Sequence, residues 1–289
     1  MDKTKSKKDF TNALSYNWLK ICAFTLIAAI VWMIVFSVIS PRVTNGQTFY
    51  FYTFGDIESI DLKSLVKNAQ SGGALSYDVR EIVASKVAKD EAQRLTAYLG
   101  AGEGDVIVVR DDTFNFGLSG FYDIDSLLAD TEEFCMKFSS SESEFIIDEQ
   151  KVREDFLKNK KKDKRFKTQK QKEEGVVLAE ERVANMYKSA VYLKKVLTYC
   201  DENNVDIRKI TKLNEKDETE QEKTYALKLR AIDKAINCFS TRDEDGKLTT
   251  EGLYIAVFDY RGTQGNAQFE TVGFLAYLVR NYGNFPISE

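Results

Sequence analysis

The sequence of 289 residues contains no histidine, and this absence excludes more chemistry than any other feature of its composition. Without histidine the chain cannot build a Ser-His-Asp or Cys-His nucleophile system, and it lacks the commonest protein ligand of zinc and iron. Carboxylates are abundant, yet no pair of them lies in an apolar setting that would separate their acidities. The sequence therefore predicts neither an enzyme nor a cofactor.

Cysteine is scarce as well. Only Cys135, Cys200 and Cys238 lie beyond an apolar N-terminal run, and none of them belongs to a Cys-x-x-Cys pair. An odd number of cysteines without metal-ligand spacing indicates neither a disulfide framework nor a structural zinc site. A single bridge between Cys200 and Cys238 stays open as an alternative.

Two short loops resemble ligand-binding motifs but lack the necessary residues. The Ala-Gly-Glu-Gly turn at 101–104 has no following Lys-Ser or Lys-Thr and precedes a strand, whereas phosphate-binding loops follow one. The acidic turn at 243–246 would place Thr241 and Gly252 where a calcium loop needs an aspartate and a bidentate glutamate. We expect neither a nucleotide nor a metal at these loops.

An apolar run without charge extends over residues 21–39. As a helix, these 19 residues would reach about 28 Å, close to the roughly 30 Å hydrocarbon core of a bilayer. A cleaved secretory signal is the competing interpretation, but the run is longer than a signal core and Pro41 follows the best cleavage site. The sequence therefore predicts a single transmembrane helix.

Basic residues are concentrated before the apolar run. Five lysines lie within residues 1–20, whereas only Arg42 follows the run closely. Because basic flanks stay in the cytoplasm, we expect a protein of the cell membrane with a cytoplasmic tail over 1–20 and an extracellular C-terminal domain.

Strand and helix patterns alternate through most of the remaining chain. Period-two or continuous apolar patterns predict strands over 47–54, 75–84, 105–109 and 253–260. Helices are expected from Asp61, over 90–99, over 124–138 with Asp125 as N-cap, and around 269–282. Such alternation indicates an α/β sheet covered by helices on both sides.

The middle of the chain has a different composition. Residues 158–172 contain nine Lys or Arg and a single acid, a pattern typical of a solvated helix surface or a loop, with contact to an anionic polymer or lipid headgroups as the alternative. Two long amphipathic helices are expected after it, over 176–200 and 218–238. Nucleic acid is not an expected partner, because interleaved aromatic residues are missing from the basic run.

Three passages resemble the extracellular solute-binding proteins of ABC importers. Tyr98 to Asp112, YLGAGEGDVIVVRDD, looks like the turn and hydrophobic strand of that family, and Phe121 to Leu128, FYDIDSLL, resembles the passage that follows it. Leu253 to Tyr282 is similar to the family's late strand, Asn-rich loop and helix. Together they cover about a fifth of the chain.

The resemblance implies a reduced, bacterial relative with one periplasmic-binding-protein-like α/β lobe and a helical insert, preceded by the transmembrane helix. Family members usually run to about 400 residues, so the resemblance implies that we should expect no complete second lobe. In chain order, we expect a tail over 1–20, a transmembrane helix over 21–39, the first part of the lobe over 46–145, a charged helical insert over 146–240 and the end of the lobe over 241–289.

The resemblance and the physics of open α/β sheets both place a ligand site at the carboxyl ends of the strands. Aromatic faces there would stack on a sugar or an apolar group, and carboxylates would accept hydrogen bonds from hydroxyls or amines. The candidates are Thr53, Phe54, Asp111, Asp112, Thr113, Phe114, Phe116, Tyr260 and Arg261. The alternative for each residue is a turn or a place in the core.

Two functions follow. In the first, the domain captures or senses a small solute or peptide outside the cell, for a membrane partner such as a transporter. In the second, it has lost ligand binding and serves as a surface scaffold or an accessory subunit of a membrane complex. An open aromatic cleft near Phe114 would favour the first, and an exposed apolar patch at Tyr187 or Tyr225 the second.

Overall fold

A computed structural model describes residues 18, 20, 22–36, 43, 45–111, 120–160, 163–214, 220–259 and 267–287. Their contacts divide the chain into two units, Met1–Val43 and Thr44–Glu289. Residues 22–36 of the first unit are helical.

No helix among the described residues is both long and apolar enough to cross a membrane. The predicted transmembrane helix over 21–39 is therefore not supported, and the expected fold is corrected in that part.

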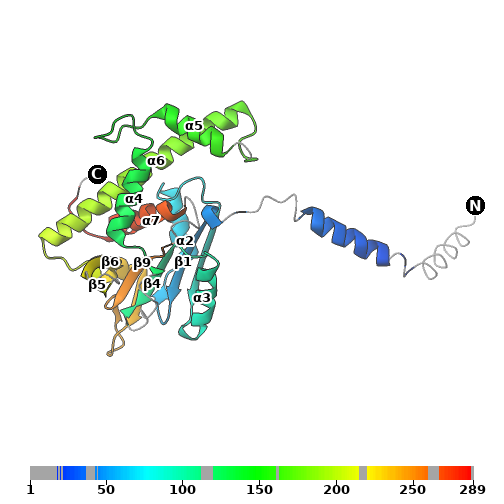
Figure 1. Ribbon diagram of the computed structural model, residues 1–289. Coiled ribbons are helices and arrows are strands. Elements are labelled where there is room, and N and C mark those ends of the chain that lie inside the picture. Colours follow the sequence, from blue (N-terminus) through cyan, green and yellow to red (C-terminus); the bar gives the residue numbers. More distant parts are fainter. Residues whose placement is uncertain are drawn as a thin grey trace, which may run out of the picture. The chain divides into compact units, whose positions relative to one another are not determined.

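A mixed six-stranded sheet forms the centre of the second unit (Figure 1). Strand β1 (Thr48–Phe54) pairs in parallel with β3 (Glu81–Val87) on one side and with β4 (Val106–Arg110) on the other. Beyond β4 the order continues antiparallel, through β9 (Leu253–Val257) and β6 (Glu220–Lys228) to β5 (Arg208–Asn214). All seven residues of β1 are buried, so this strand is covered on both faces.

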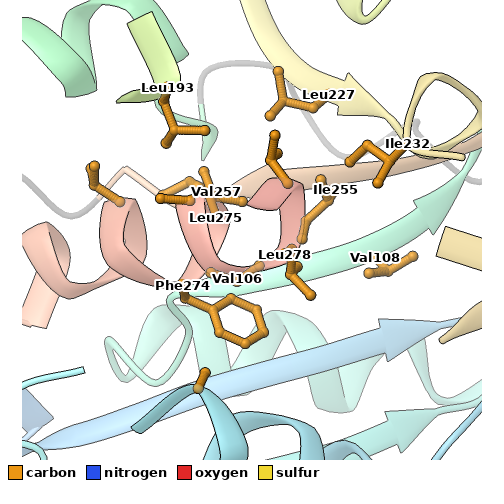
Figure 2. Close-up of a cluster of buried hydrophobic side chains, with 14 of the residues drawn as sticks. Val106, Val108, Leu193, Leu227, Ile232, Ile255, Val257, Phe274, Leu275 and Leu278 are labelled. Carbon is orange, nitrogen blue, oxygen red and sulfur yellow. The ribbon is translucent and has the colours of Figure 1, made fainter. Parts of the chain in front are cut away.

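Helices cover the two faces of the sheet unequally. One face packs against α2 (Leu62–Ser71), α4 (Ile124–Met136), α6 (Gln169–Glu202) and α7 (Ala267–Tyr282). Figure 2 shows Phe274, Leu275 and Leu278 of α7 among the valines and isoleucine of β4 and β9. The other face is covered mainly by α3 (Ala92–Gly100), where Tyr98 stacks on Tyr52 with 5.8 Å between ring centroids.

Two smaller parts complete the unit. Strands β2 (Glu58–Ser59), β7 (Phe239–Arg242) and β8 (Leu248–Thr249) form a second sheet. Helix α5 (Glu149–Asn159) packs on the first half of α6, and short 3-10 turns lie at Asn45–Gln47, Lys89–Glu91, Leu229–Ala231 and Ala235–Asn237.

Side-chain caps explain where several helices begin. Asp61 caps α2 by accepting from the backbone N–H of Lys63, as the sequence predicts. The cap of α4 is Asp123, which accepts from Ser126 N at 3.0 Å, so the predicted cap at Asp125 is wrong. Asp125 instead accepts hydrogen bonds from Arg208.

The predicted helix over 218–238 is wrong. Residues 220–228 form strand β6, and only 3-10 turns follow it. Side chains on both faces of β6 are buried between β9 and β5, so the strand has no period-two pattern, and the helical spacing of Tyr225 continues only through Leu229 and Ile232 beyond its end. A register shift at Lys209/Ile210 leaves Tyr225 as the extra residue of a β-bulge.

The predicted strand over 75–84 begins later than expected, because polar side chains hold residues 75–80 in a loop. The backbone N–H and hydroxyl of Ser76 donate to Glu270 of α7, at 2.9 and 2.7 Å. Asp78 is buried and pairs with Lys160 and Arg165, at 2.8 and 3.2 Å. Two residues of the basic run, Lys160 and Arg165, thus form ion pairs with the buried carboxylate of Asp78.

The three cysteines of the second unit are free thiols in the core. The bridge between Cys200 and Cys238 that the sequence left open does not form. Burial raises the pKa of Cys135 to about 12 and of Cys200 to about 11, so these thiols are protonated and unreactive at neutral pH.

Asp105 joins three strands at the start of β4. It is only 2% exposed, and its Oδ2 accepts a hydrogen bond from Tyr50 N at 2.7 Å. Its backbone carbonyl accepts from the N–H of Phe258, just after β9. Burial raises the pKa of the Asp105 carboxyl well above its ordinary value.

We expect Asp105 to make stability depend on pH. Because its folded pKa is raised, its contribution is fully present below the unfolded value near 3.9 and is lost as pH rises through the folded value. Asp105→Asn keeps an acceptor oxygen without a charge, so it should gain at least about 1 kcal/mol over the wild type between pH 4 and 7. Urea unfolding across this range measures the difference. Parallel profiles for the two proteins would contradict it, and Asp245→Asn, 79% exposed in a turn, is the control.

Helix α7 approaches the loop after α2 so closely that only glycine fits at Gly273. A Cβ there would lie 2.0 Å from the backbone oxygen of Ala74. We expect Gly273→Ala to lower the free energy of unfolding by about 2 kcal/mol or more, because backbone must move. Gly100→Ala, with nothing within 4 Å of its Cβ, should be neutral or gain up to about 1 kcal/mol. Equal losses in chemical denaturation would show that the close approach is not the cause.

Candidate functional site

The order of the parallel strands creates a crevice at one edge of the sheet. From its carboxyl end, β1 leads through α2 to β3, whereas β4, on the other side of β1, leads on towards α4. The connections from two adjacent strands thus run in opposite directions. Ligands of open α/β sheets bind at such a switch point, outside the carboxyl ends of the strands.

A cleft of about 430 Å³ opens at this switch point. Its walls come from the turn after β1, from the last residue of β4 and from β7 of the small sheet. The lining residues are Gly55, Asp56, Ile57, Glu58, Arg110, Thr241 and Arg242. The small sheet therefore forms one wall of the site, and the β2–β7 pairing of Glu58 with Ser240 holds it there.

The turn after β1 gives the cleft its floor. Gly55 has a φ of 88°, in the left-handed region that favours glycine, and its N–H donates to Val87 O of β3 at 2.9 Å. This turn directs Asp56 and Glu58 to the surface while Ile57 is buried in the core. Two exposed carboxylates therefore lie directly beyond the end of β1.

Two guanidinium groups face these carboxylates. Arg110 Nη1 donates to Thr241 Oγ1 at 3.2 Å, and this hydroxyl lies 3.4 Å from the backbone oxygen of Asp56. Arg242 Nε donates to Glu58 Oε1 at 2.9 Å. The cleft thus presents groups of both charges around one open volume.

Three of the residues predicted for the site lie at the end of the parallel strands. Thr53 and Phe54 end β1, but both are buried, Thr53 completely. Asp111 follows β4 and pairs with Lys209 Nζ at 2.8 Å. None of the three lines the cleft. Its lining includes the residue directly after Phe54 and the residue directly before Asp111, but neither Phe54 nor Asp111 itself.

The other predicted residues lie outside the part of the chain that the structure describes. They are Asp112, Thr113, Phe114, Phe116, Tyr260 and Arg261. Within the described part of the chain, Val257 at the end of β9 pairs with Val106 at the start of β4. The carboxyl end of β9 therefore lies at the opposite edge of the sheet from the cleft.

The sequence analysis missed the residues that do line the cleft. Arg110 directly precedes the candidate Asp111, and Asp56 lies two residues after the candidate Phe54, so a polar residue near a strand end is the signal that would have found them. Thr241 and Arg242 gave no such signal, because they reach the site through β7, far along the chain.

No protein-family model, curated protein or solved structure matches the chain in the comparisons with known proteins. The class of protein is therefore defined by the fold and the cleft: a mixed α/β sheet with a charged crevice at its topological switch point.

The hydroxyl of Thr53 is fully buried and has no hydrogen-bond partner among the described residues. Because an unpaired buried hydroxyl costs free energy, we expect Thr53→Val to raise the free energy of unfolding by about 1 kcal/mol. Thr131→Val is the matched control, because the equally buried Thr131 donates to Leu127 O at 2.7 Å. Urea denaturation should show no gain for the control. A loss of stability in Thr53→Val would mean that the hydroxyl is paired.

Proposed function

We propose that residues 44–289 form a solute-binding domain that captures a small zwitterionic solute, an amino acid or a short peptide, in the cleft beyond β1 and β4. The observation that carries this proposal is the lining of the cleft, where Asp56 and Glu58 face Arg110 and Arg242. A ligand with one ammonium and one carboxylate group complements both charges at once.

The chemistry of each group suits this role. A guanidinium binds a carboxylate through two parallel hydrogen bonds, which fixes the orientation of the ligand. A carboxylate such as Asp56 accepts from the three N–H donors of an ammonium group. Asp56 makes no ion pair with any described residue, so its charge is available.

The pair between Arg242 and Glu58 does not block the site. Their side chains are 59% and 51% exposed, and exposed ion pairs contribute at most about 1 kcal/mol. Exchanging this pair for contacts with a ligand therefore costs little. Arg110, in contrast, is held by Thr241, which gives the ligand carboxylate one pre-oriented donor.

The alternative role as a scaffold has less support. It requires an exposed apolar patch around Tyr187 or Tyr225. Tyr187 stacks on Phe145 with 4.2 Å between ring centroids, and Tyr225 is buried within β6. Delivery of the solute to a membrane transporter is part of our proposal and rests on the sequence resemblance alone.

A thermal-shift panel on the full chain tests the proposal. We expect an amino acid or a dipeptide to raise the melting temperature saturably, because a ligand that binds only the folded state stabilises it. Asp56→Asn should weaken that binding by about tenfold or more, the effect of losing a hydrogen bond to a charged group. Isothermal titration calorimetry measures the affinity.

Asp245→Asn is the matched control, because it removes the same charge from an exposed turn outside the cleft. Its affinity should equal that of the wild type. No shift with any amino acid or dipeptide at 10 mM, or equal affinities for Asp56→Asn and the wild type, would contradict the proposal.

A further inference from the structure

A second cavity, of about 470 Å³, lies between helices α6 and α7 and the turn after α2. It is separate from the charged cleft. Residues just before the N-terminus of α2 line the cleft, whereas residues just after the C-terminus of α2 line this cavity. The ten residues of α2 span about 15 Å between them. Its volume falls within the 300–1,000 Å³ that small-molecule sites usually enclose.

The charged side chains that line this cavity are all basic. Lys188 and Lys195 come from α6 and Arg280 from α7, and no carboxylate is among the described residues of its wall. Neither lysine forms an ion pair with a described residue, in contrast to Lys194 between them, which pairs with Glu132 at 2.9 Å. An anion entering the cavity would therefore meet two lysines that form no ion pair with a described residue, with the Arg280 guanidinium beside them.

Tyrosines supply the remaining walls. Tyr187 and Tyr192 come from α6 and Tyr277 from α7. The Arg280 guanidinium lies over the Tyr192 ring, 4.7 Å from its centroid, and Tyr187 is fixed by stacking on Phe145. The cavity thus combines flat apolar surfaces with positive charge, the combination that an aromatic ring carrying an anionic group requires.

The frame of the cavity is rigid. Arg182 and Glu270 form a buried ion pair at 2.7 Å between α6 and α7, and Glu270 also accepts from the backbone N–H and hydroxyl of Ser76. Asn185 Nδ2 lies 3.4 Å from the backbone oxygen of Gly73, across the cavity wall. Because helices and turn are tied to one another, little ordering free energy is needed when a ligand binds.

We propose that this cavity binds a small free aromatic anion, an aromatic ring that carries a carboxylate or a phosphate group. The anionic group lies among Lys188, Lys195 and Arg280, and the ring lies against the tyrosines. Free aromatic carboxylates and aryl phosphates share this chemistry, and the experiment separates them.

Isothermal titration calorimetry of the full chain with phenyl phosphate and with benzoate tests the proposal. Inorganic phosphate and phenol serve as fragments that carry only the charge or only the ring. We expect at least one aromatic anion to bind at least tenfold more tightly than either fragment, and its affinity to fall as salt is raised. The aromatic anion that binds more tightly identifies the anionic group.

Lys195→Gln should weaken binding of that anion by about tenfold, whereas Lys194→Gln, which removes the same charge one residue earlier on α6, should leave it unchanged. Both lysines are exposed, so neither substitution should prevent folding. Asp56→Asn should also leave it unchanged, which separates this site from the amino-acid cleft. Failure of both anions to bind at 10 mM, or equal losses in the two lysine variants, would overturn the proposal.

Discussion

Strand β1 has to be covered on both faces, because all seven of its side chains are buried, and the rest of the unit follows from this requirement. Phe49 and Phe51 face the helices α2 and α7, and Tyr50 and Tyr52 face the side of α3. A strand with two apolar faces needs helices on both sides, which parallel crossovers to β3 and β4 provide. The connection that leaves β1 runs to β3, whereas the one that leaves β4 runs to the other side, so this arrangement also creates the crevice at the carboxyl end of β1.

Glu270 connects the helical layer to this sheet. Its carboxylate is buried and accepts from Arg182 of α6 and from Ser76 in the loop before β3. Leaving one member of a buried ion pair alone costs about 3–5 kcal/mol, so α6, α7 and the loop are held as one body. Because Gly273 lets α7 reach Ala74 at the same place, both packing and charge fix the walls of the cavity between α6 and α7.

The sequence was sufficient where one local pattern decides the structure. The aromatic run of β1, the β-branched run of β4 and the cap at Asp61 are such cases, because each combines a pattern with a clear boundary. The prediction of a helix over residues 220–228 was wrong, because a bulged strand that is buried on both faces imitates helical spacing. The cleft lies at the carboxyl ends of β1 and β4, yet Arg242 reaches it through tertiary pairing of β7, which no local pattern contains.

The openness of the cleft sets the strength with which it can hold a solute. Arg242 and Glu58 are more than half exposed, so water screens their charges and each new ion pair contributes at most about 1 kcal/mol. A few such contacts, reduced by the entropy lost on binding, give dissociation constants no tighter than the millimolar range. An exposed cleft of this kind is therefore suited to rapid exchange of solute. The cavity between α6 and α7, walled by tied helices, is suited to longer occupancy.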